Sequence, residues 1–418
     1  MTIFTEYHSS RLSYILDTLF TQAYTLTHNK AQYLDALGEK LNYSHQKICK
    51  DEVWIIPHTL LFEKNIIPQK FEIFQWKDVP AFFNTGGDIP FDFLAASFYL
   101  VSRYEEYLPY RPDEYGRFPH TASLAFQHRF LNLPLIDFWI QEIFPELPGG
   151  TFTFLPTFDI DIAFKYSGKP FLKNLASLLK EYVTGQRPFF SMPKLTDRKN
   201  VKDPFDQFDF LEELCRKRLL NPVYFFLFAE KNRRYDKNIL PHKMELKNLI
   251  LEIASNNKTG IHPSWQSGDD PTLLTKEIEN LEKLIGQKII TSRQHYIRMT
   301  MPLTYRMLLD NGILQDYSMG YGSINGFRAS TSKSFFWYDL EKEIKTNLCI
   351  FPFCYMDANA IFEQKLNPEE ASQELDFYKT IITKTQGQMI GIWHNHFLTE
   401  EKEWQPWRKV FVDFIKKS

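Results

Sequence analysis

The sequence has few cysteines, no long apolar run and no excess of charge of either sign. Its four cysteines lack the spacing of a zinc knuckle, so we expect free thiols, with the two in the apolar run 348–355 buried. No stretch reaches the roughly 18 apolar residues that a membrane-spanning helix needs. Charged residues interrupt positions 1–19, which argues against a secretory signal. These absences predict a cytoplasmic protein without a membrane span.

The balance of charge argues against nucleic acid as a partner. Lysine and arginine together number 49, aspartate and glutamate number 51, and no basic block is present that would follow a phosphate backbone. The composition is instead rich in aromatic residues, which make up 16% of the chain. We interpret these rings as core packing.

Chain length and a turn-rich run predict two domains, 1–150 and 151–418. A chain of 418 residues exceeds the usual size of one domain, and the Pro-Glu-Leu-Pro-Gly-Gly run at 145–150 interrupts the pattern of helices and strands. Residues 1–150 indicate a smaller α/β accessory domain, with helices expected over 11–26 and 91–108 and strands over 53–62 and 71–76. Its charged cluster at 102–107 contains Arg103, Glu105 and Glu106, which we interpret as ion pairs on a solvated helix face.

Residues 151–418 alternate short apolar strands with helix-like segments. Asp270, just before the proline that opens one of these helices, is interpreted as a helix N-cap. Seven strand–helix units predict an α/β fold with a parallel sheet closed into a distorted (β/α) barrel. Strands are expected near 152–158, 223–228, 259–262, 288–292, 313–317, 348–355 and 388–393. Helices are expected over 205–219, 242–256, 271–285, 301–311 and 367–385, with an additional helix over 171–183.

Two carboxylates lie at the end of the first of these strands. Asp159 and Asp161 are two residues apart, and residues at that spacing share one face of a strand. Two like charges so close repel each other unless a cation neutralises them or one of them holds a proton. The pair therefore indicates a reactive site. The alternative is a solvated aspartate that caps the segment after the strand.

Other reactive side chains follow four more of the expected strands. Because catalytic groups gather at the carboxyl ends of the strands in parallel barrels, these side chains predict one site. They are His262 after the third strand, Arg293 and His295 after the fourth, Asp316 at the end of the fifth, and Trp393, His394, Asn395 and His396 at the end of the seventh.

The order of these motifs resembles the polysaccharide deacetylase family, which are metal-dependent carbohydrate N- and O-deacetylases with a distorted (β/α) barrel. The resemblance covers about residues 152–418, and the long form with an N-terminal module looks like chains of Bacteroidetes-type bacteria. It rests on Thr157-Phe158-Asp159 with Asp161, His262-Pro263-Ser264-Trp265-Gln266, Arg293-Gln294-His295-Tyr296, Asp316, and Trp393-His394-Asn395.

The resemblance implies a role for each matching residue. By this resemblance Asp159 is the general base, and Asp161 and His262 are ligands of a divalent metal, with zinc, nickel or cobalt as the candidates. His394 is implied to be the general acid. Arg293 would orient Asp159 and keep it ionised.

One position departs from the family pattern. Gln266 stands where the family has a second metal-binding histidine, and an amide is a weaker ligand for zinc than an imidazole. Either another imidazole completes the site, with His295 as the first choice and His396 as the second, or metal binding is weakened or lost.

The expected reaction is hydrolysis of an acetyl group by a metal-activated water. One carboxylate and two imidazoles would hold the ion, Asp159 would take the proton of the water, and His394 would protonate the leaving sugar amine or alkoxide. The substrate would be an acetylated saccharide or a glycan precursor, contacted by Tyr321, Arg328 and Trp393.

Other functions stay open, among them an Asp-x-Asp glycosyltransferase, whose two carboxylates would hold a manganese–nucleotide sugar. Gln266 favours a saccharide-binding protein on a deacetylase fold that has lost its chemistry. An Asp-x-Asp phosphatase also has two aspartates after its first strand, although it normally has Thr or Val where this chain has Ala163. Such a phosphatase would make no use of His262 and His394.

Overall fold

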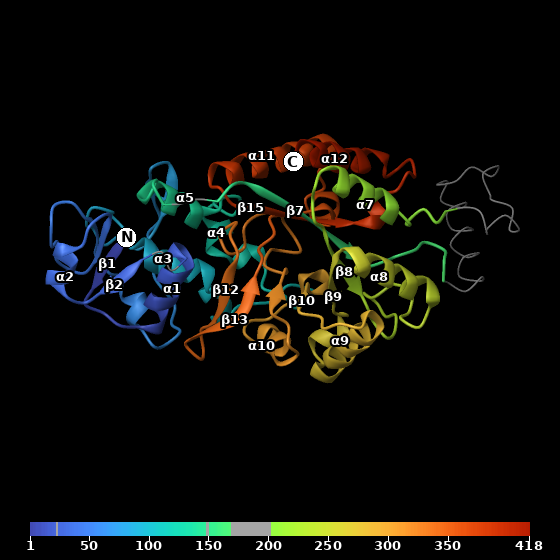
Figure 1. Cartoon of the computed structure of the whole chain (residues 1–418), viewed down its shortest axis with the longest axis horizontal. Coiled ribbons are helices and arrows are strands. Elements are labelled where there is room, and N and C mark those ends of the chain that lie inside the picture. Colours follow the sequence, from blue (N-terminus) through green and yellow to red (C-terminus); the bar gives the residue numbers. More distant parts are fainter. Residues whose placement is uncertain (22–23, 148–149, 169–201) are drawn as a thin grey trace, which may run out of the picture. The chain divides into compact units, whose positions relative to one another are not determined.

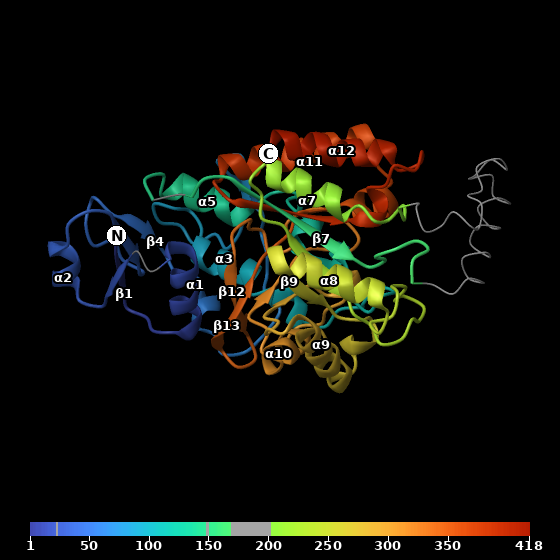
Figure 2. The same cartoon turned by 45° about the vertical axis from the view of Figure 1, so that its right-hand side comes forward.

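The computed structural model describes residues 1–21, 24–147, 150–168 and 202–418 (Figures 1 and 2). The chain forms two compact units, each of which combines separate stretches of sequence. Unit 1 contains Met1–Thr153, Tyr296–Tyr355 and Phe377–Ile390, and unit 2 contains Phe154–His295, Met356–Asp376 and Gly391–Ser418. Unit 1 therefore adds two later segments to the region predicted as the accessory domain. The helix expected over 171–183 lies outside the described residues.

A parallel four-stranded sheet forms the first part of unit 1. Its strands are β1 (Thr2–Thr5), β2 (Thr25–Thr27), β3 (Lys40–Tyr43) and β4 (Val53–Ile55), in the order β2-β1-β3-β4. Helix α1 (Ser10–Phe20) connects β1 to β2, and helix α2 (Lys30–Asp35) connects β2 to β3. The strand expected over 53–62 ends early, since Pro57 lacks the N–H of a continuing ladder and Thr59–Phe62 form the 3-10 helix η1.

Short elements complete the part of unit 1 before residue 150. Helix α3 (Phe93–Val101) is buried along its whole length, as a helix that is apolar on every side must be. It ends before the predicted residue 108 because Arg103 adopts the left-handed conformation, with φ 54°. The other elements are the antiparallel strands β5 (Phe74–Trp76) and β6 (Val79–Ala81), followed by η2 (Tyr104–Tyr107), η3 (His120–Ala122), α4 (Leu124–Gln127) and α5 (Leu135–Ile143).

The later segments of unit 1 depart from the predicted strand–helix alternation. They contain α10 (Leu303–Asp310) and three strands in the order β12-β13-β11, namely β11 (Gln315–Asp316), β12 (Phe335–Asp339) and β13 (Ile344–Ile350). Strand β13 is parallel to β11 but antiparallel to β12. The hairpin that β12 and β13 form was not predicted.

The charged cluster at 102–107 is buried, so its interpretation as solvated ion pairs is wrong. The side chains of Arg103 and Glu106 are each 1% exposed. Arg103 donates hydrogen bonds to Glu106 at 2.8 Å and to Glu105 at 2.6 Å. Arg328 donates two more to Glu106, at 2.8 and 2.5 Å, from 222 residues further along the chain. Arg103 and Arg328 together neutralise the buried carboxylate of Glu106, and no local pattern could indicate the distant Arg328.

Replacing Arg328 by alanine is expected to destabilise unit 1 strongly. Removal of one partner of a buried ion pair costs ~3–5 kcal/mol, because the other charge stays buried without compensation. An exposed pair contributes only ~0–1 kcal/mol, and Lys77 with Glu142 provides one, at 3.2 Å with side chains 52% and 38% exposed. Urea unfolding should therefore show a large loss for Arg328→Ala and little change for Lys77→Ala. Equal losses in the two variants would contradict this account.

The parallel strands β7 to β10, with β15 next to β7, form the core of unit 2, and both β7 and β15 begin with residues of unit 1. These strands follow the order β10-β9-β8-β7-β15. The pairs β7–β8, β8–β9 and β9–β10 are parallel, which confirms the parallel arrangement predicted for them. The bounds are β7 (Thr153–Ile160), β8 (Val223–Leu227), β9 (Lys258–His262), β10 (Thr291–Ser292) and β15 (Gln388–His394).

The register of these strands brings their carboxyl ends to one level. Asp159 pairs with Phe225, and Leu227 pairs with His262. Two residues beyond Asp159, Asp161 therefore falls at the level of His262. The neighbouring strands thus deliver their last side chains to one edge of the sheet.

Helices cover the strands of unit 2. Figure 1 shows α7 beside α12 and α8 beside α9. The N-cap prediction for α9 is confirmed, because the side chain of Asp270 accepts a hydrogen bond from the Leu273 N–H at 3.1 Å. The bounds are α7 (Phe208–Lys217), α8 (Met244–Asn256), α9 (Pro271–Ile285) and α12 (Gln405–Lys417), and α11 (Pro368–Lys384) has residues in both units.

Two predictions about composition can be compared with the described residues. No helix among them combines the length and the apolarity needed to cross a bilayer. All four cysteines are free thiols, and Cys354 is buried as predicted, whereas Cys349 is half-buried.

Candidate metal centre

Strand β7 delivers two carboxylates to its carboxyl end. The side chain of Asp159 is 3% exposed, and that of Asp161, one residue beyond the strand, is 21% exposed. Asn238 holds the chain here, since its Nδ2 donates to the Ile160 carbonyl at 3.1 Å and its Oδ1 accepts from the Ala163 N–H at 3.0 Å. The two carboxylates are therefore fixed close together.

Arg293, which follows β10, binds Asp159. Its Nη1 donates to Asp159 Oδ1 at 2.8 Å and to Thr157 Oγ1 at 2.7 Å, and its side chain is fully buried. The guanidinium lies over the ring of Phe225, 4.4 Å from the centroid. Gly260 makes room for this ring, because a Cβ there would come within 2.8 Å of it. Arg293 thus occupies one oxygen of Asp159 and leaves Oδ2 facing the histidines.

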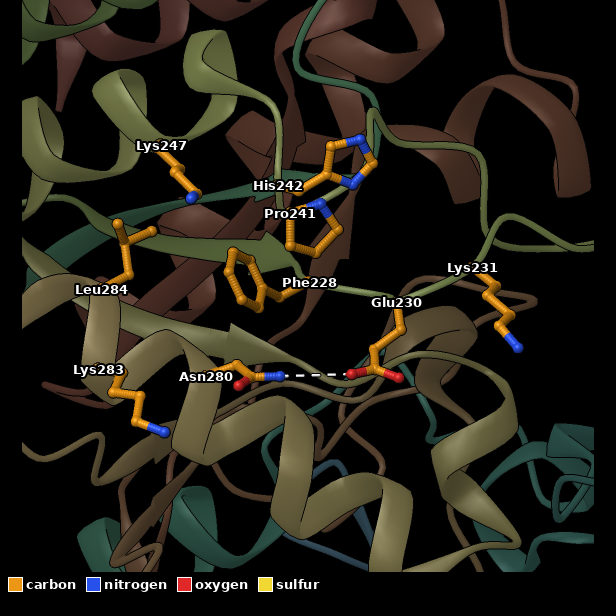
Figure 3. A pocket seen from close by; sticks show the side chains of 9 residues that line it. All are labelled: Phe228, Glu230, Lys231, Pro241, His242, Lys247, Asn280, Lys283 and Leu284. Atoms are coloured by element: carbon orange, nitrogen blue, oxygen red, sulfur yellow. Dashed lines mark hydrogen bonds between the residues drawn. The ribbon is translucent and has the colours of Figure 1, made fainter.

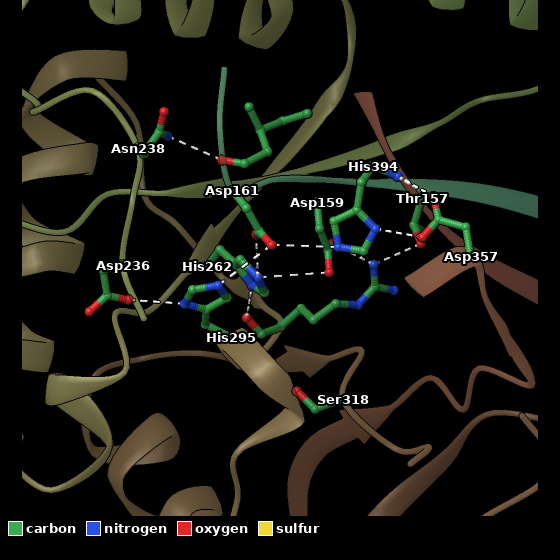
Figure 4. Close-up of polar contacts among 12 residues, drawn as sticks. Thr157, Asp159, Asp161, Asp236, Asn238, His262, His295, Ser318, Asp357 and His394 are labelled. Carbon is green, nitrogen blue, oxygen red and sulfur yellow. Dashed lines mark hydrogen bonds and ion pairs between the residues drawn. The ribbon is translucent and has the colours of Figure 1, made fainter. Parts of the chain in front are cut away.

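His262, the last residue of β9, faces both carboxylates (Figure 4). Its Nδ1 lies 2.6 Å from the carbonyl oxygen of Arg293. A carbonyl can only accept, so Nδ1 carries a hydrogen, and in the neutral ring Nε2 presents a lone pair. That Nε2 is 3.1 Å from Asp161 Oδ1 and 3.8 Å from Asp159 Oδ2. A cation between these atoms would stabilise such an arrangement.

His295 brings a second imidazole to Asp161. Its Nε2 lies 3.5 Å from Asp161 Oδ2, and its Nδ1 lies 3.0 Å from Asp236 Oδ1. Burial alone would lower the pKa of His295, but Asp161 and Asp236 raise it to about 9. Burial alone would raise the pKa of Asp161, but His295 and His262 hold it well below its usual value. This corner of the site therefore favours an ionised carboxylate beside a positive charge.

Asp161, His262 and His295 form a group that could hold a metal ion. One ligand atom from each residue lies within 4.8 Å of the other two. Asp161 Oδ1 is buried and, with the ring of His262 neutral and its Nε2 unprotonated, accepts no hydrogen bond among the described residues. One carboxylate with two imidazoles is a donor set that suits zinc and related divalent ions and leaves a fourth position open. The residues present therefore fit a divalent ion.

His394, the last residue of β15, faces the same carboxylates. Its Nδ1 lies 2.6 Å from Asp357 Oδ1, and its backbone N–H donates to Asp357 Oδ2 at 2.7 Å. Its Nε2 is 3.5 Å from Asp161 Oδ2. Burial alone would lower the pKa of His394, but Asp357, Asp161 and Asp159 raise it to about 9. Figure 4 shows this ring close to Asp159 and hydrogen-bonded to Asp357.

Two aspartates of this centre were missed in the sequence. Asp357 directly follows strand β14 (Tyr355–Met356), so the strand-end argument applied elsewhere could have found it. Asp236 lies in the irregular segment between β8 and α8, where no periodicity singles it out. Asp316, taken from the sequence as the fourth motif, lies in unit 1 and accepts hydrogen bonds from the N–H and hydroxyl of Ser318.

Gln266 and His396 lie outside the ligand group. Gln266 Nε2 donates to Asp236 Oδ2 at 2.6 Å. The ring of His396 lies against that of Phe397, with centroids 4.1 Å apart. Of the two imidazoles that could replace the missing histidine, the structure brings His295 to the group.

The three residues predicted to bind substrate are buried. Trp393 points away from the carboxylates because neighbouring strand residues face opposite sides, and its ring lies against Phe411 of α12, 4.8 Å between centroids. In unit 1, Arg103 Nη2 donates to the hydroxyl of Tyr321 at 3.1 Å. Arg328 is engaged in the buried ion pairs described above. Each of these contacts is with another residue of the chain, and the substrate role of the three residues stays a prediction.

A separate hollow of about 610 Å³ lies in unit 2. Figure 3 shows the ring of Phe228 in its middle and Glu230 facing Asn280, whose Nδ2 donates to Glu230 Oε1 at 3.4 Å. None of the predicted site residues lines it. The lining residues are Phe228, Glu230, Lys231, Pro241, His242, Lys247, Asn280, Lys283 and Leu284.

Comparisons with known proteins give a family match for the first part of the chain and structural matches over much of the chain. Residues 1–148 match the model of a family of unknown function, DUF7033. No curated protein sequence matches the chain. Among solved structures, the chain is similar to proteins named as polysaccharide deacetylases.

In three of these comparisons the match covers most of the other protein's chain. The protein from Mycobacterium smegmatis is 13% identical, with a TM-score of 0.40, over 65% of this chain and 84% of that chain. The protein from Pseudomonas aeruginosa PAO1 is 12% identical, with a TM-score of 0.40, over 74% of this chain and 91% of that chain. The protein from Bacillus cereus is 8% identical, with a TM-score of 0.31, over 64% of this chain and 88% of that chain. Identities and TM-scores this low assign no function to the chain.

Proposed function

We propose that the chain is a metal-dependent hydrolase that removes an acetyl or similar acyl group from an amino sugar or polysaccharide. The observation that carries this proposal is the ligand group of Asp161, His262 and His295, flanked by the carboxylate of Asp159 and the imidazole of His394. When bound, a divalent ion, with zinc as the first candidate and nickel or cobalt as alternatives, would polarise the acyl carbonyl and make a water molecule more acidic.

Asp159 is the proposed general base. Arg293 holds Oδ1 at 2.8 Å, and Oδ2 faces the ligand group, 3.8 Å from His262 Nε2. The fixed carboxylate can accept the proton of a water molecule at this position. Arg293 keeps the accepting oxygen turned toward the ligand group and is a positioning residue.

His394 is the proposed general acid. Its Nδ1–H donates a hydrogen bond to Asp357, so the proton available for transfer is the one on Nε2. This nitrogen faces the carboxylates of the site, and the Asp357 carboxylate raises the pKa of the ring, which favours its protonated form. His394 can therefore supply a proton to the leaving amine or alkoxide of a sugar.

The choice of an acetylated saccharide or glycan precursor rests on the motif resemblance of residues 152–418. Gln266, which favoured a saccharide-binding protein without activity, contacts Asp236 and leaves a complete donor set beside it. An Asp-x-Asp phosphatase would give no role to the two imidazoles that face Asp161. The hydrolase is therefore the function that uses all of these residues.

Three further predictions belong to this proposal. The strands of 151–418 would close into a distorted seven-unit barrel, with the metal centre at their carboxyl ends. Residues 1–150 would form the accessory domain. The protein would act in the cytoplasm, where a glycan precursor is the accessible substrate.

Acetate release from acetylated glucosamine oligosaccharides tests the proposal. The purified protein is expected to release acetate, to lose this activity on treatment with a chelator and to regain it with zinc, cobalt or nickel. His394→Gln should lower turnover by roughly 10²-fold or more with the ion retained, because glutamine is polar but supplies no proton. Acetate release that survives complete removal of metal would contradict the proposal, and wild-type turnover in His394→Gln would contradict the role of His394.

A further inference from the structure

Asp236 is fully buried and accepts three hydrogen bonds. Its Oδ1 lies 3.0 Å from His295 Nδ1 and accepts from the Trp265 N–H, also at 3.0 Å. Its Oδ2 accepts from Gln266 Nε2 at 2.6 Å. Two oxygens would repel at this distance, so the amide nitrogen of Gln266 must face the carboxylate. Asp236 is therefore held from two sides.

This arrangement fixes the ring of His295. The hydrogen on Nδ1 is bound to Asp236, so the lone pair of a neutral ring lies on Nε2, which faces Asp161. A carboxylate behind a metal-binding imidazole orients the ring and increases its basicity. His262 receives the equivalent contact from a backbone carbonyl, which no substitution removes. Of the two imidazoles, only His295 depends on a side chain for this support.

We propose that Asp236, held by Gln266, is a positioning residue that sets the affinity of the centre for its divalent ion. The inference rests on the proposed function. Gln266, which stands where the family pattern has its second histidine, would thus act on the ion through Asp236 and His295. The loop between β8 and α8, which carries Asp236, becomes part of the metal centre.

A second aspartate–histidine pair in the same site provides a matched control. Asp357 lies 2.6 Å from His394 Nδ1, much as Asp236 lies 3.0 Å from His295 Nδ1. Both aspartates are buried. His394 is outside the ligand group, however. Removing the charge of Asp357 should therefore affect turnover and leave metal affinity unchanged.

The test is the zinc affinity of the full chain, measured by competition with a chromophoric chelator. Asp236→Asn and Asp236→Ala are expected to bind zinc ~10–100-fold more weakly than the wild type. Gln266→Ala should weaken binding by a smaller factor, because the Trp265 N–H still holds Asp236. Asp357→Asn should bind zinc as the wild type does. Thermal unfolding of the metal-free proteins shows that each variant is folded.

The outcomes separate this inference from the proposed function. Wild-type affinity in folded Asp236→Asn would overturn the inference and leave the metal centre in place. Equal weakening in Asp357→Asn would also overturn it, because the effect would then be a general loss of buried charge. A wild-type protein that binds no zinc would overturn the proposed function itself. If the Asp236 variants do not fold, unchanged affinity in Gln266→Ala overturns the inference.

Discussion

Asp161→Asn is expected to release the bound ion and to lower turnover at least ~10³-fold. Asp161 is the one carboxylate of the ligand group, and His262 and His295 must be neutral to bind an ion. An asparagine carries no charge and is a weaker ligand for a divalent cation. The Lewis-acid contribution to catalysis is several kcal/mol, and each ~1.4 kcal/mol corresponds to tenfold in rate.

Metal content by elemental analysis and acetate release, measured on the same preparation, check this prediction. Asp270→Asn is the matched control, since it makes the same chemical change at the N-cap of α9 in the same unit. Asparagine caps helices as well as aspartate does, so this variant should keep its ion and its turnover. An Asp161→Asn protein that retains both would remove Asp161 from the ligand set.

Asp159→Asn is expected to lower turnover by up to ~10⁴-fold while the ion stays bound. Asparagine keeps the size of the side chain and can still accept the hydrogen bond from Arg293, but it cannot take a proton from water. The variant also leaves a buried guanidinium without its counter-charge, so we expect a lower melting temperature. Thermal unfolding must therefore accompany the kinetic measurement.

The contrast between the two aspartates is the informative result. Loss of turnover with full metal content assigns Asp159 to proton transfer, whereas loss of the ion from Asp159→Asn would make it a ligand and refute the assignment. Arg293→Lys provides a second comparison, because lysine keeps the charge but cannot reach both Asp159 Oδ1 and Thr157 Oγ1 in the same geometry. We expect it to lower turnover and to retain the ion.

Much of this centre could be predicted because parallel strands bring their carboxyl ends to one edge. The positions of Asp159, Asp161 and His262 need only the strand assignments and the period of two along a strand. The same period separates His394, which faces the carboxylates, from Trp393, which lies against Phe411. The buried side of Trp393 could therefore have been inferred from the sequence.

Contacts between distant segments could not be predicted in the same way. Asp236 reaches His295 from an irregular loop, 59 residues away in the chain. Arg103 and Glu106 are polar enough to be expected in solvent, and the buried Glu106 pairs both with Arg103 and with the distant Arg328. In both cases the decisive partner is set by tertiary structure, which local propensity and periodicity do not report.

Anomalous diffraction from crystals of the wild-type protein reconstituted with zinc tests the central claim most directly. The account predicts one strong peak within ~2.0–2.2 Å of Asp161, His262 Nε2 and His295 Nε2, with His394 outside the coordination sphere. A peak coordinated by Gln266 or His396 in place of His295, or no peak among these residues, would contradict it.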